Sequence, residues 1–297
     1  MKDLIRKKLK EKNVLLLAHN YQPPEIQDVA DMCGDSLELS IRAGKTDADI
    51  IIFCGVHFMA ETASIISPEK KVLLPKTNAG CPMADMITPE SLIEKKSSLP
   101  GVPVVTYVNS PASVKAISDI CCTSANAVKV INSLPDKAVL MTPDKNLAQY
   151  TAQHTTKEIH FWEGFCPIHN NLTPDMLTAA KQKYPDADVL AHPECRSDVL
   201  LLADAILSTS GMLKYVSQSD KDEFVIATES GLLYPLQKNN PNKKFYSASD
   251  VLTCLDMKKI SLQDIVNTLD TLSPEIRVPE NIRKKAIKAV ERMISIF

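Results

Sequence analysis

Short apolar runs recur along the chain, and segments whose apolar residues have helical spacing separate them. The runs VLLL (14–17) and DIIIF (49–53) are almost purely apolar. Continuous apolar runs of this length are typical of strands that are buried on both faces of a parallel sheet. Strands that alternate with helices indicate βαβ units. The hydropathy pattern therefore predicts an α/β protein with parallel sheets.

Specific residues mark the ends of several predicted helices. Residues 88–90 (Thr-Pro-Glu) and 173–175 (Thr-Pro-Asp) each place an N-cap Thr before a Pro and an acid in the first turn. Segment 1–14 carries Leu and Ile at helical spacing among charges and no cleavage signal, so we expect an amphipathic first helix and no signal peptide. Segment 279–297 predicts an amphipathic closing helix.

The chain contains three related units. The residues that end their first apolar runs, His19, Tyr107 and His192, lie 88 and then 85 residues apart. The same two offsets relate four further triples, which are Tyr21, Asn109 and Glu194; Asp31, Asp119 and Asp204; Ser36, Ser124 and Thr209; and Phe53, Met141 and Ile226. The cysteines that close the units, Cys81, Cys166 and Cys254, are spaced by 85 and then 88 residues. Six triples at nearly constant offsets predict a threefold repeat.

Each unit is predicted to run helix, strand, turn, helix, strand, helix, strand and cysteine loop. We expect three homologous three-layer αβα domains with parallel sheets around a pseudo-threefold axis. The predicted units are 1–83, 84–168 and 169–255, and segment 256–297 is predicted to pack back on the first unit. Ligands of open α/β sheets bind beyond the carboxyl ends of the strands. The active site is therefore expected at the central interface.

Composition and charge exclude several classes of partner. A formal net charge of −2 supplies no field that would hold a nucleic-acid backbone or an anionic membrane. No apolar run approaches the length of a membrane span. We expect a cytoplasmic protein with no nucleic-acid partner and no membrane partner.

The eight cysteines include no CxxC pair, and in a reducing compartment most are expected to be small buried apolar residues. The three that close the units are different, because Pro follows Cys81 and Cys166, as it often follows iron–sulfur ligands. Three cysteines would leave one iron of a [4Fe–4S] cluster without a protein ligand, and that iron can act as a Lewis acid. A zinc site closed by His169, a nucleophilic role for Cys166 and simple packing are the alternatives.

The polar triples favour a site for a small anion. Residues two apart at the end of a strand, such as His19 and Tyr21, point the same way. Ser36, Ser124 and Thr209 precede predicted helices, whose N-termini bind phosphate or carboxylate groups. Ordinary N-capping, or three separate surface loops with satisfied polar groups, are the alternatives.

Ten motifs in order along nearly the whole chain resemble those of the quinolinate synthase family. They are LAHNYQ.PE.QD.AD..GDS (17–36), FMAE (58–61), CPMA (81–84), YVNS (107–110), TSANAV (123–128), PD.NLA.Y (143–150), CP.H (166–169), HPEC (192–195), STSGM (208–212) and C.DMK (254–258). The resemblance implies three homologous α/β domains and a [4Fe–4S] cluster on three cysteines with one open iron. It also implies condensation of iminoaspartate with dihydroxyacetone phosphate to quinolinate, with release of phosphate and water, in de novo NAD biosynthesis.

By motif, the resemblance assigns functions to individual residues. The cluster ligands fall on Cys81, Cys166 and Cys254, and the substrate-contacting positions fall on His19, Ser36, Tyr107, Asn109, Ser124, His192, Glu194 and Thr209. Tyr21 and His169 also lie in active-site motifs. Glu194 is expected to move protons and the two tyrosines to donate hydroxyl protons. The expected partners are the two substrates and, transiently, the enzyme that supplies iminoaspartate, and the chain is expected to be a monomer.

Two further expectations concern the loop around Cys166. The aromatic residues of FWEGF (161–165) predict the end of a buried strand that shields the cluster, and Phe165 replaces a smaller or more polar residue of the family. The chain lacks the CxxC pair that some relatives carry near the C-terminus, so no redox switch is expected there. Two other functions stay open, a non-catalytic anion-binding module and an electron-transfer iron–sulfur protein.

Overall fold

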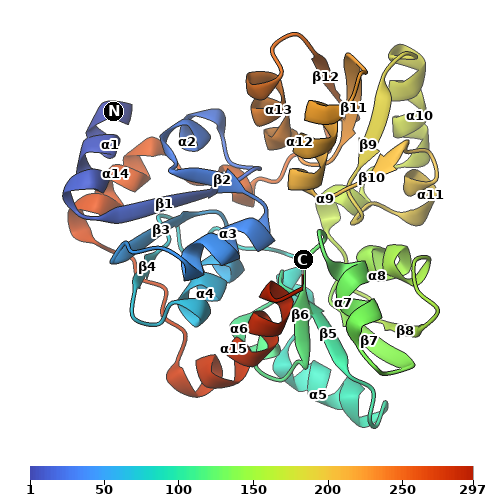
Figure 1. Cartoon of the computed structure of the whole chain (residues 1–297), viewed down its shortest axis with the longest axis horizontal. Coiled ribbons are helices and arrows are strands. Elements are labelled where there is room, and N and C mark those ends of the chain that lie inside the picture. The colour runs from blue at the N-terminus through green and yellow to red at the C-terminus, as the bar shows by residue number, and fades with distance from the viewer. Residues whose placement is uncertain (297) are drawn as a thin grey trace.

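Three separate sheets, each of four parallel strands, form the framework of the protein (Figure 1). The computed structural model describes residues 1–296. In each sheet the strand order is second, first, third, fourth, so every neighbouring pair is parallel. The strands are β1 (Val14–His19), β2 (Met32–Gly34), β3 (Ile50–Cys54), β4 (Lys71–Leu73), β5 (Val104–Tyr107), β6 (Ile120–Cys122), β7 (Ala138–Thr142), β8 (Glu158–Phe161), β9 (Asp188–Ala191), β10 (Ala205–Ile206), β11 (Glu223–Ala227) and β12 (Lys244–Ser247). The predicted α/β class with parallel sheets is confirmed.

Helices cover both faces of these sheets, which explains the continuous apolar runs. All six residues of β1 are buried, so neither face of this strand meets solvent. The α-helices are α1 (Lys2–Glu11), α2 (Pro24–Val29), α3 (Ser36–Gly44), α4 (His57–Ile66), α5 (Pro89–Ser97), α6 (Ala112–Lys115), α7 (Ala127–Ser133), α8 (Lys145–Ala152), α9 (Pro167–Asn170), α10 (Pro174–Lys183), α11 (Ser197–Leu200), α12 (Thr209–Gln218), α13 (Leu233–Asn239), α14 (Leu262–Thr271) and α15 (Glu280–Ile294). No helix within residues 1–296 has both the length and the apolarity that a membrane crossing requires.

The prediction of three strands per unit was wrong, because each unit has a fourth. The additional strands β2, β6 and β10 contain only two or three residues, and each follows a short helix of four to six residues. The sequence predicted a turn in these places, since segments this short show no periodicity of their own. Backbone pairing with the first strand of the unit, and not local pattern, makes them strands.

The predicted helix ends agree with the structure. Thr88 caps α5 by accepting a hydrogen bond from Ser91 N–H, and Thr173 caps α10 by accepting one from Met176 N–H. The first and closing helices are α1 and α15. The final residue of the predicted closing segment, position 297, lies outside the described residues.

The aspartate triple of the repeat has a structural role. Asp31, Asp119 and Asp204 each accept a hydrogen bond from a backbone N–H near the start of the first strand of the unit, and the donors are Leu16, Val104 and Val189 at 2.8, 2.8 and 2.7 Å. Each aspartate lies 15 residues after its donor. Each unit therefore has its own aspartate carboxylate, and the three carboxylates fix the same crossover in their units.

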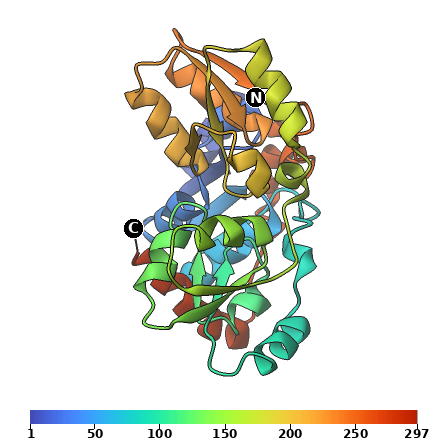
Figure 2. The same cartoon turned by 90° about the vertical axis from the view of Figure 1, so that its right-hand side faces the viewer.

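The three units surround a common central region (Figure 1). In Figure 2, seen from the right-hand side, the second unit (green) lies below the third (yellow to orange). Leu17, Met141 and Ile226, one from each sheet, belong to one hydrophobic cluster, so the units pack through a shared core. At the C-terminus, α14 contacts α1, whereas α15 contacts α4, α6 and β6 and so joins the first two units. The boundaries of the units and the pseudo-threefold axis stay predictions.

The predicted buried strand before Cys166 was wrong. Strand β8 lies at the edge of its sheet, its Ile159 is buried, and its Phe161 is exposed. Trp162 lies beyond the strand and donates its indole N–H to Met86 O at 2.9 Å. The single tryptophan therefore fastens the segment before the cysteine loop to the start of the unit.

Candidate active site

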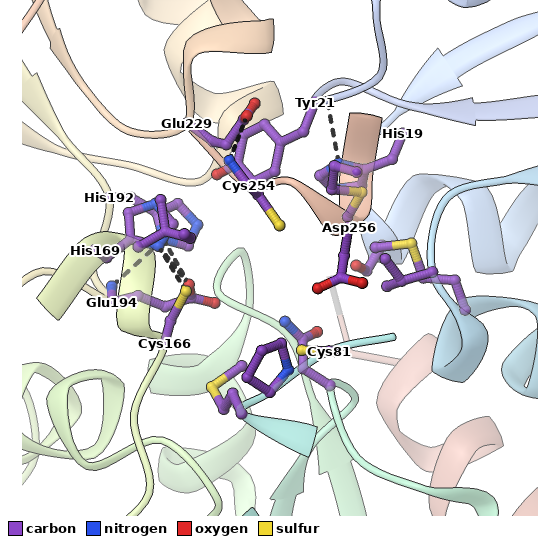
Figure 3. A pocket seen from close by; sticks show the side chains of 18 of the residues that line it. His19, Tyr21, Cys81, Cys166, His169, His192, Glu194, Glu229, Cys254 and Asp256 are labelled. Carbon is purple, nitrogen blue, oxygen red and sulfur yellow. Dashed lines mark hydrogen bonds and ion pairs between the residues drawn. The ribbon is translucent and has the colours of Figure 1, made fainter. Parts of the chain in front are cut away.

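The predicted site residues lie at the carboxyl ends of the strands and line one cavity. His19 ends β1, Tyr107 ends β5, and His192 directly follows β9. The cavity has a volume of about 310 Å³. Its lining includes every predicted site residue, namely His19, Tyr21, Ser36, Cys81, Tyr107, Asn109, Ser124, Cys166, His169, His192, Glu194, Thr209 and Cys254. Side chains from the third unit face side chains from the first unit across this cavity (Figure 3).

The hydroxyl triple is less regular than predicted. Ser36 and Thr209 are the first residues of α3 and α12, but Asp35 and Ser208 are the N-caps, so the alternative of ordinary N-capping by Ser36 and Thr209 is wrong. Ser124 lies three residues before α7. Two helix N-termini, not three, thus open on the cavity with a hydroxyl at the first position.

Glu194 lies at the centre of a buried hydrogen-bond network. Tyr107 donates its hydroxyl to Glu194 Oε1 at 2.6 Å, and His169 Nδ1 lies 2.7 Å from Glu194 Oε2. Burial by itself raises the pKa of this carboxyl, but the adjacent His169 and the Tyr107 hydroxyl overcome that effect and hold the pKa below its usual range. Glu194 is therefore a carboxylate with two partners that can pass protons.

His169 continues the network toward the first unit. Its Nε2 lies 2.9 Å from Thr228 Oγ1, which lies 2.5 Å from the hydroxyl of Tyr21. Burial and the negative charge of Glu194 raise the pKa of Tyr21 well above its usual value, so its hydroxyl keeps the proton at neutral pH. The resulting chain joins Tyr107, Glu194, His169, Thr228 and Tyr21.

The sequence did not single out Thr228. It follows β11, and the residue 85 positions earlier is Pro143. The three units do not share a hydroxyl residue at this position, so the repeat gave no indication that Thr228 belongs to the site. Glu229, Asp256, Phe58 and Met59 also line the cavity without having been predicted.

His19 and His192 are buried as neutral imidazoles. Burial lowers the pKa of both to about 3, against the opposing effect of the Glu194 charge. The ring of His192 stacks on that of His169 with centroids 4.7 Å apart, and its Nε2 lies 3.2 Å from Ser124 Oγ. Neutral rings of this kind offer one donor and one acceptor to a ligand.

These two histidines predict that the fold loses stability in mild acid. Below pH 6.5 the unfolded chain binds protons that the folded His19 and His192 bind only near pH 3, so stability falls as the pH drops through that window. At pH 5 we expect a loss of about 2 kcal/mol for each histidine. Denaturant unfolding of the anaerobic protein at pH 7 and pH 5 measures it.

The His19→Gln, His192→Gln double variant provides the control for this prediction. It should show a shallower dependence of stability on pH, whatever its absolute stability. The same slope in the double variant and the parent would contradict the assignment.

The three unit-closing cysteines are free thiols on the cavity wall. Burial raises the pKa of Cys166 well above its usual value and that of Cys81 to about 12, which leaves no appreciable thiolate at neutral pH without a cation. A nucleophilic role for Cys166 is therefore disfavoured. Cys166 also forms, with His169 and Glu194, a group whose ligand atoms lie within 4.8 Å of one another and could hold a metal ion.

The other cysteines agree with the packing interpretation. Cys54, Cys121, Cys122 and Cys195 are buried, and Cys33 is partly buried. The Cys195 thiol points to Ala227 O at 3.5 Å. None of these cysteines is among the residues that line the cavity in the described chain.

Comparison with known proteins places the chain in a family. The family profile described as Quinolinate synthetase A protein matches residues 3–295. The chain belongs to the quinolinate synthase family. A quinolinate synthase of Geobacter metallireducens is 56% identical over all of this chain and 97% of its own length. Those of Dehalococcoides mccartyi and Desulforudis audaxviator are 51% and 50% identical over 97% of this chain and 95% of their own lengths.

Family membership decides between the functions that the spacing left open. The chain is an enzyme of the quinolinate synthase kind. A non-catalytic anion-binding module and an electron carrier are thereby excluded. The cavity at the centre of the three sheets is its candidate active site.

Proposed function

We propose that this enzyme condenses iminoaspartate with dihydroxyacetone phosphate to quinolinate, with release of phosphate and water, in de novo NAD biosynthesis. The observation that supports this proposal is the meeting of the polar triples and the three cysteines of the repeat in one cavity. Two anionic substrates need several donors, and condensation and dehydration need groups that move protons. The location is proposed to be the cytoplasm and the chain a monomer that meets the supplier of iminoaspartate only transiently.

The cysteines fit a [4Fe–4S] cluster. They come from three separate loops, are not paired as disulfides, and line the same cavity. Cys81, Cys166 and Cys254 would hold three irons, and the fourth iron would supply Lewis-acid polarisation of substrate oxygen or nitrogen. The Cys166–His169–Glu194 group is a weaker fit for zinc, because both His169 nitrogens already have protein partners.

The first and third units supply two helix N-termini that suit anions. The α3 and α12 N-termini place Ser36 and Thr209 at the cavity, where their N–H groups and hydroxyls suit phosphate or carboxylate oxygens. Asn109 Oδ1 is buried on the cavity wall and has no partner among the described residues. Such an atom supports substrate contact, since buried polar atoms are seldom left unpaired. His19, Ser124 and His192 would complete the binding surface.

The hydrogen-bond chain supplies the proton movements. Glu194 would take a proton from substrate and pass it to His169 or return it through Tyr107. Tyr21, which keeps its proton, would donate it while His169 and Thr228 restore it. Both tyrosines thus act as donors with a raised pKa rather than as bases.

An anaerobic assay tests the proposal. Protein purified without oxygen is expected to form quinolinate from iminoaspartate and dihydroxyacetone phosphate, with one phosphate released for each quinolinate. It should contain about four irons and about four sulfides per chain, the content of a [4Fe–4S] cluster. Phosphate release without quinolinate, or turnover by iron-free protein, would overturn it.

A further inference from the structure

The three cysteine loops dock onto the sheets through one repeated backbone hydrogen bond. The residue two before each cysteine accepts through its carbonyl from the N–H of a residue just after the third strand. The three pairs are His57 N to Ala79 O, Lys145 N to Gly164 O and Ser230 N to Leu252 O, each at 2.8 Å. This bond fixes where each loop begins, but it does not hold the cysteine itself.

A carboxylate adds a second bond to each loop, at or next to the cysteine. Asp144 Oδ2 accepts from Cys166 N–H at 3.0 Å, and Glu229 Oε1 accepts from Cys254 N–H at 2.9 Å. Both carboxylates are 1% exposed. The amides of Cys166 and Cys254 are thus each held by the oxygen of a buried acidic side chain.

Asp144 and Glu229 occupy the same position of the repeat. They lie 85 residues apart, which is the offset between the second and third units. The second oxygen of each bonds to the start of the following helix, because Asp144 Oδ1 accepts from Leu147 N–H at 2.8 Å and Glu229 Oε2 from Gly231 N–H at 2.7 Å. One side chain therefore ties a helix start to the cysteine of its own unit.

The first unit has Val56 at this position and obtains its carboxylate from Asp256, the residue that directly follows the third unit. Asp256, two residues after Cys254, accepts at Oδ1 from Gly80 N–H at 3.1 Å, next to Cys81. Lys259 donates to the same oxygen and to Asn78 O, both at 2.6 Å. Figure 3 shows Asp256 between Cys254 and Cys81. The bond thus links two cysteine loops directly across the interface.

We propose that Asp144, Glu229 and Asp256 are positioning residues that hold the three cysteine loops ready for the cluster and keep the cluster in place. The inference rests on the cluster of the proposed function. A loop that is already fixed loses its conformational entropy when the chain folds, and not when the cluster binds. Groups that orient metal ligands typically contribute about 10- to 100-fold to metal affinity.

The test compares Asp144→Asn, Glu229→Gln and Asp256→Ala with the parent protein. The two amides replace one of two accepting oxygens by NH₂ at nearly constant volume, and alanine removes the one accepting oxygen of Asp256. The anaerobic holoproteins are mixed with a ferrous chelator, and the decay of the cluster's visible absorption is followed. We expect decay about 10- to 100-fold faster than in the parent. Decay at the parent rate in all three would overturn the inference.

Asp204→Ala is the matched control. It removes a bond of the same kind, from Val189 N–H, near the start of a strand and away from the cysteines. Its cluster should decay at the parent rate even if its melting temperature falls. Equal acceleration of cluster decay in Asp204→Ala and Asp256→Ala would show that the effect is general destabilisation and would overturn the inference.

A second measurement does not depend on the cluster. In the apoprotein, amide hydrogen exchange should speed up at Gly80 in Asp256→Ala and stay unchanged in the β-strands. If Asp144→Asn and Glu229→Gln do not fold, the variant at position 256 still tests the inference, since the Asp256 side chain is 21% exposed. If the parent protein contains no cluster, the proposed function fails, whereas an unchanged exchange rate at Gly80 refutes only the positioning role.

Discussion

Anaerobic preparations of Cys81→Ala, Cys166→Ala and Cys254→Ala are each expected to lack the cluster and to form quinolinate at least about 10³-fold more slowly than the parent. The loss is large because Lewis-acid stabilisation is worth several kcal/mol and each 1.36 kcal/mol changes the rate tenfold. The three loops come from different units, so none of the remaining thiols on the cavity wall can replace a missing one. Iron and sulfide analysis and the visible spectrum measure cluster content, and quinolinate formation measures turnover.

Cys195→Ala is the control for the cysteine variants. Cys195 directly follows Glu194, but its thiol is buried and points to the carbonyl of Ala227. The variant should keep its iron and its turnover and lose only a little stability. Retention of the cluster in any of the three ligand variants, or its loss in Cys195→Ala, would contradict the assignment of ligands.

Glu194→Gln is expected to keep a full cluster and to lose turnover by about 10²- to 10⁴-fold, the usual contribution of a general acid or base. The amide can still accept from the Tyr107 hydroxyl, but it cannot take up a proton from substrate. The amide NH₂ cannot accept a hydrogen bond from His169 Nδ1, so the proton path toward Thr228 is broken as well. Parallel measurement of iron content and steady-state turnover separates this effect from loss of the cluster.

The chain offers a matched control for this carboxylate. Glu223 accepts from the hydroxyl of Tyr246 at 3.0 Å, as Glu194 accepts from that of Tyr107, but its side chain is part-exposed and lies away from the cavity. Glu223→Gln should therefore turn over at the parent rate. Near-parent turnover in Glu194→Gln with an intact cluster would show that Glu194 is not the proton-transfer group.

Much of the candidate site could be predicted because the repeat preserves register. A strand places alternate residues on the same side, so matched positions in three homologous units reach matched places in space. The matched register predicts that His19, Tyr107 and His192 meet, and all three line one cavity. The prediction failed where the units differ, as at Ser124, which does not begin a helix.

The hydropathy and the repeat by themselves determined the α/β class, the parallel strands and the set of residues at the strand ends, because these depend on local spacing. Only the tertiary structure decided which groups bond to one another. Tyr21 and Thr228 are 207 residues apart, and Gly80 and Asp256 are 176 apart. The packing of whole units against each other brings such partners together. The periodicity of the sequence within one unit contains no information about this packing.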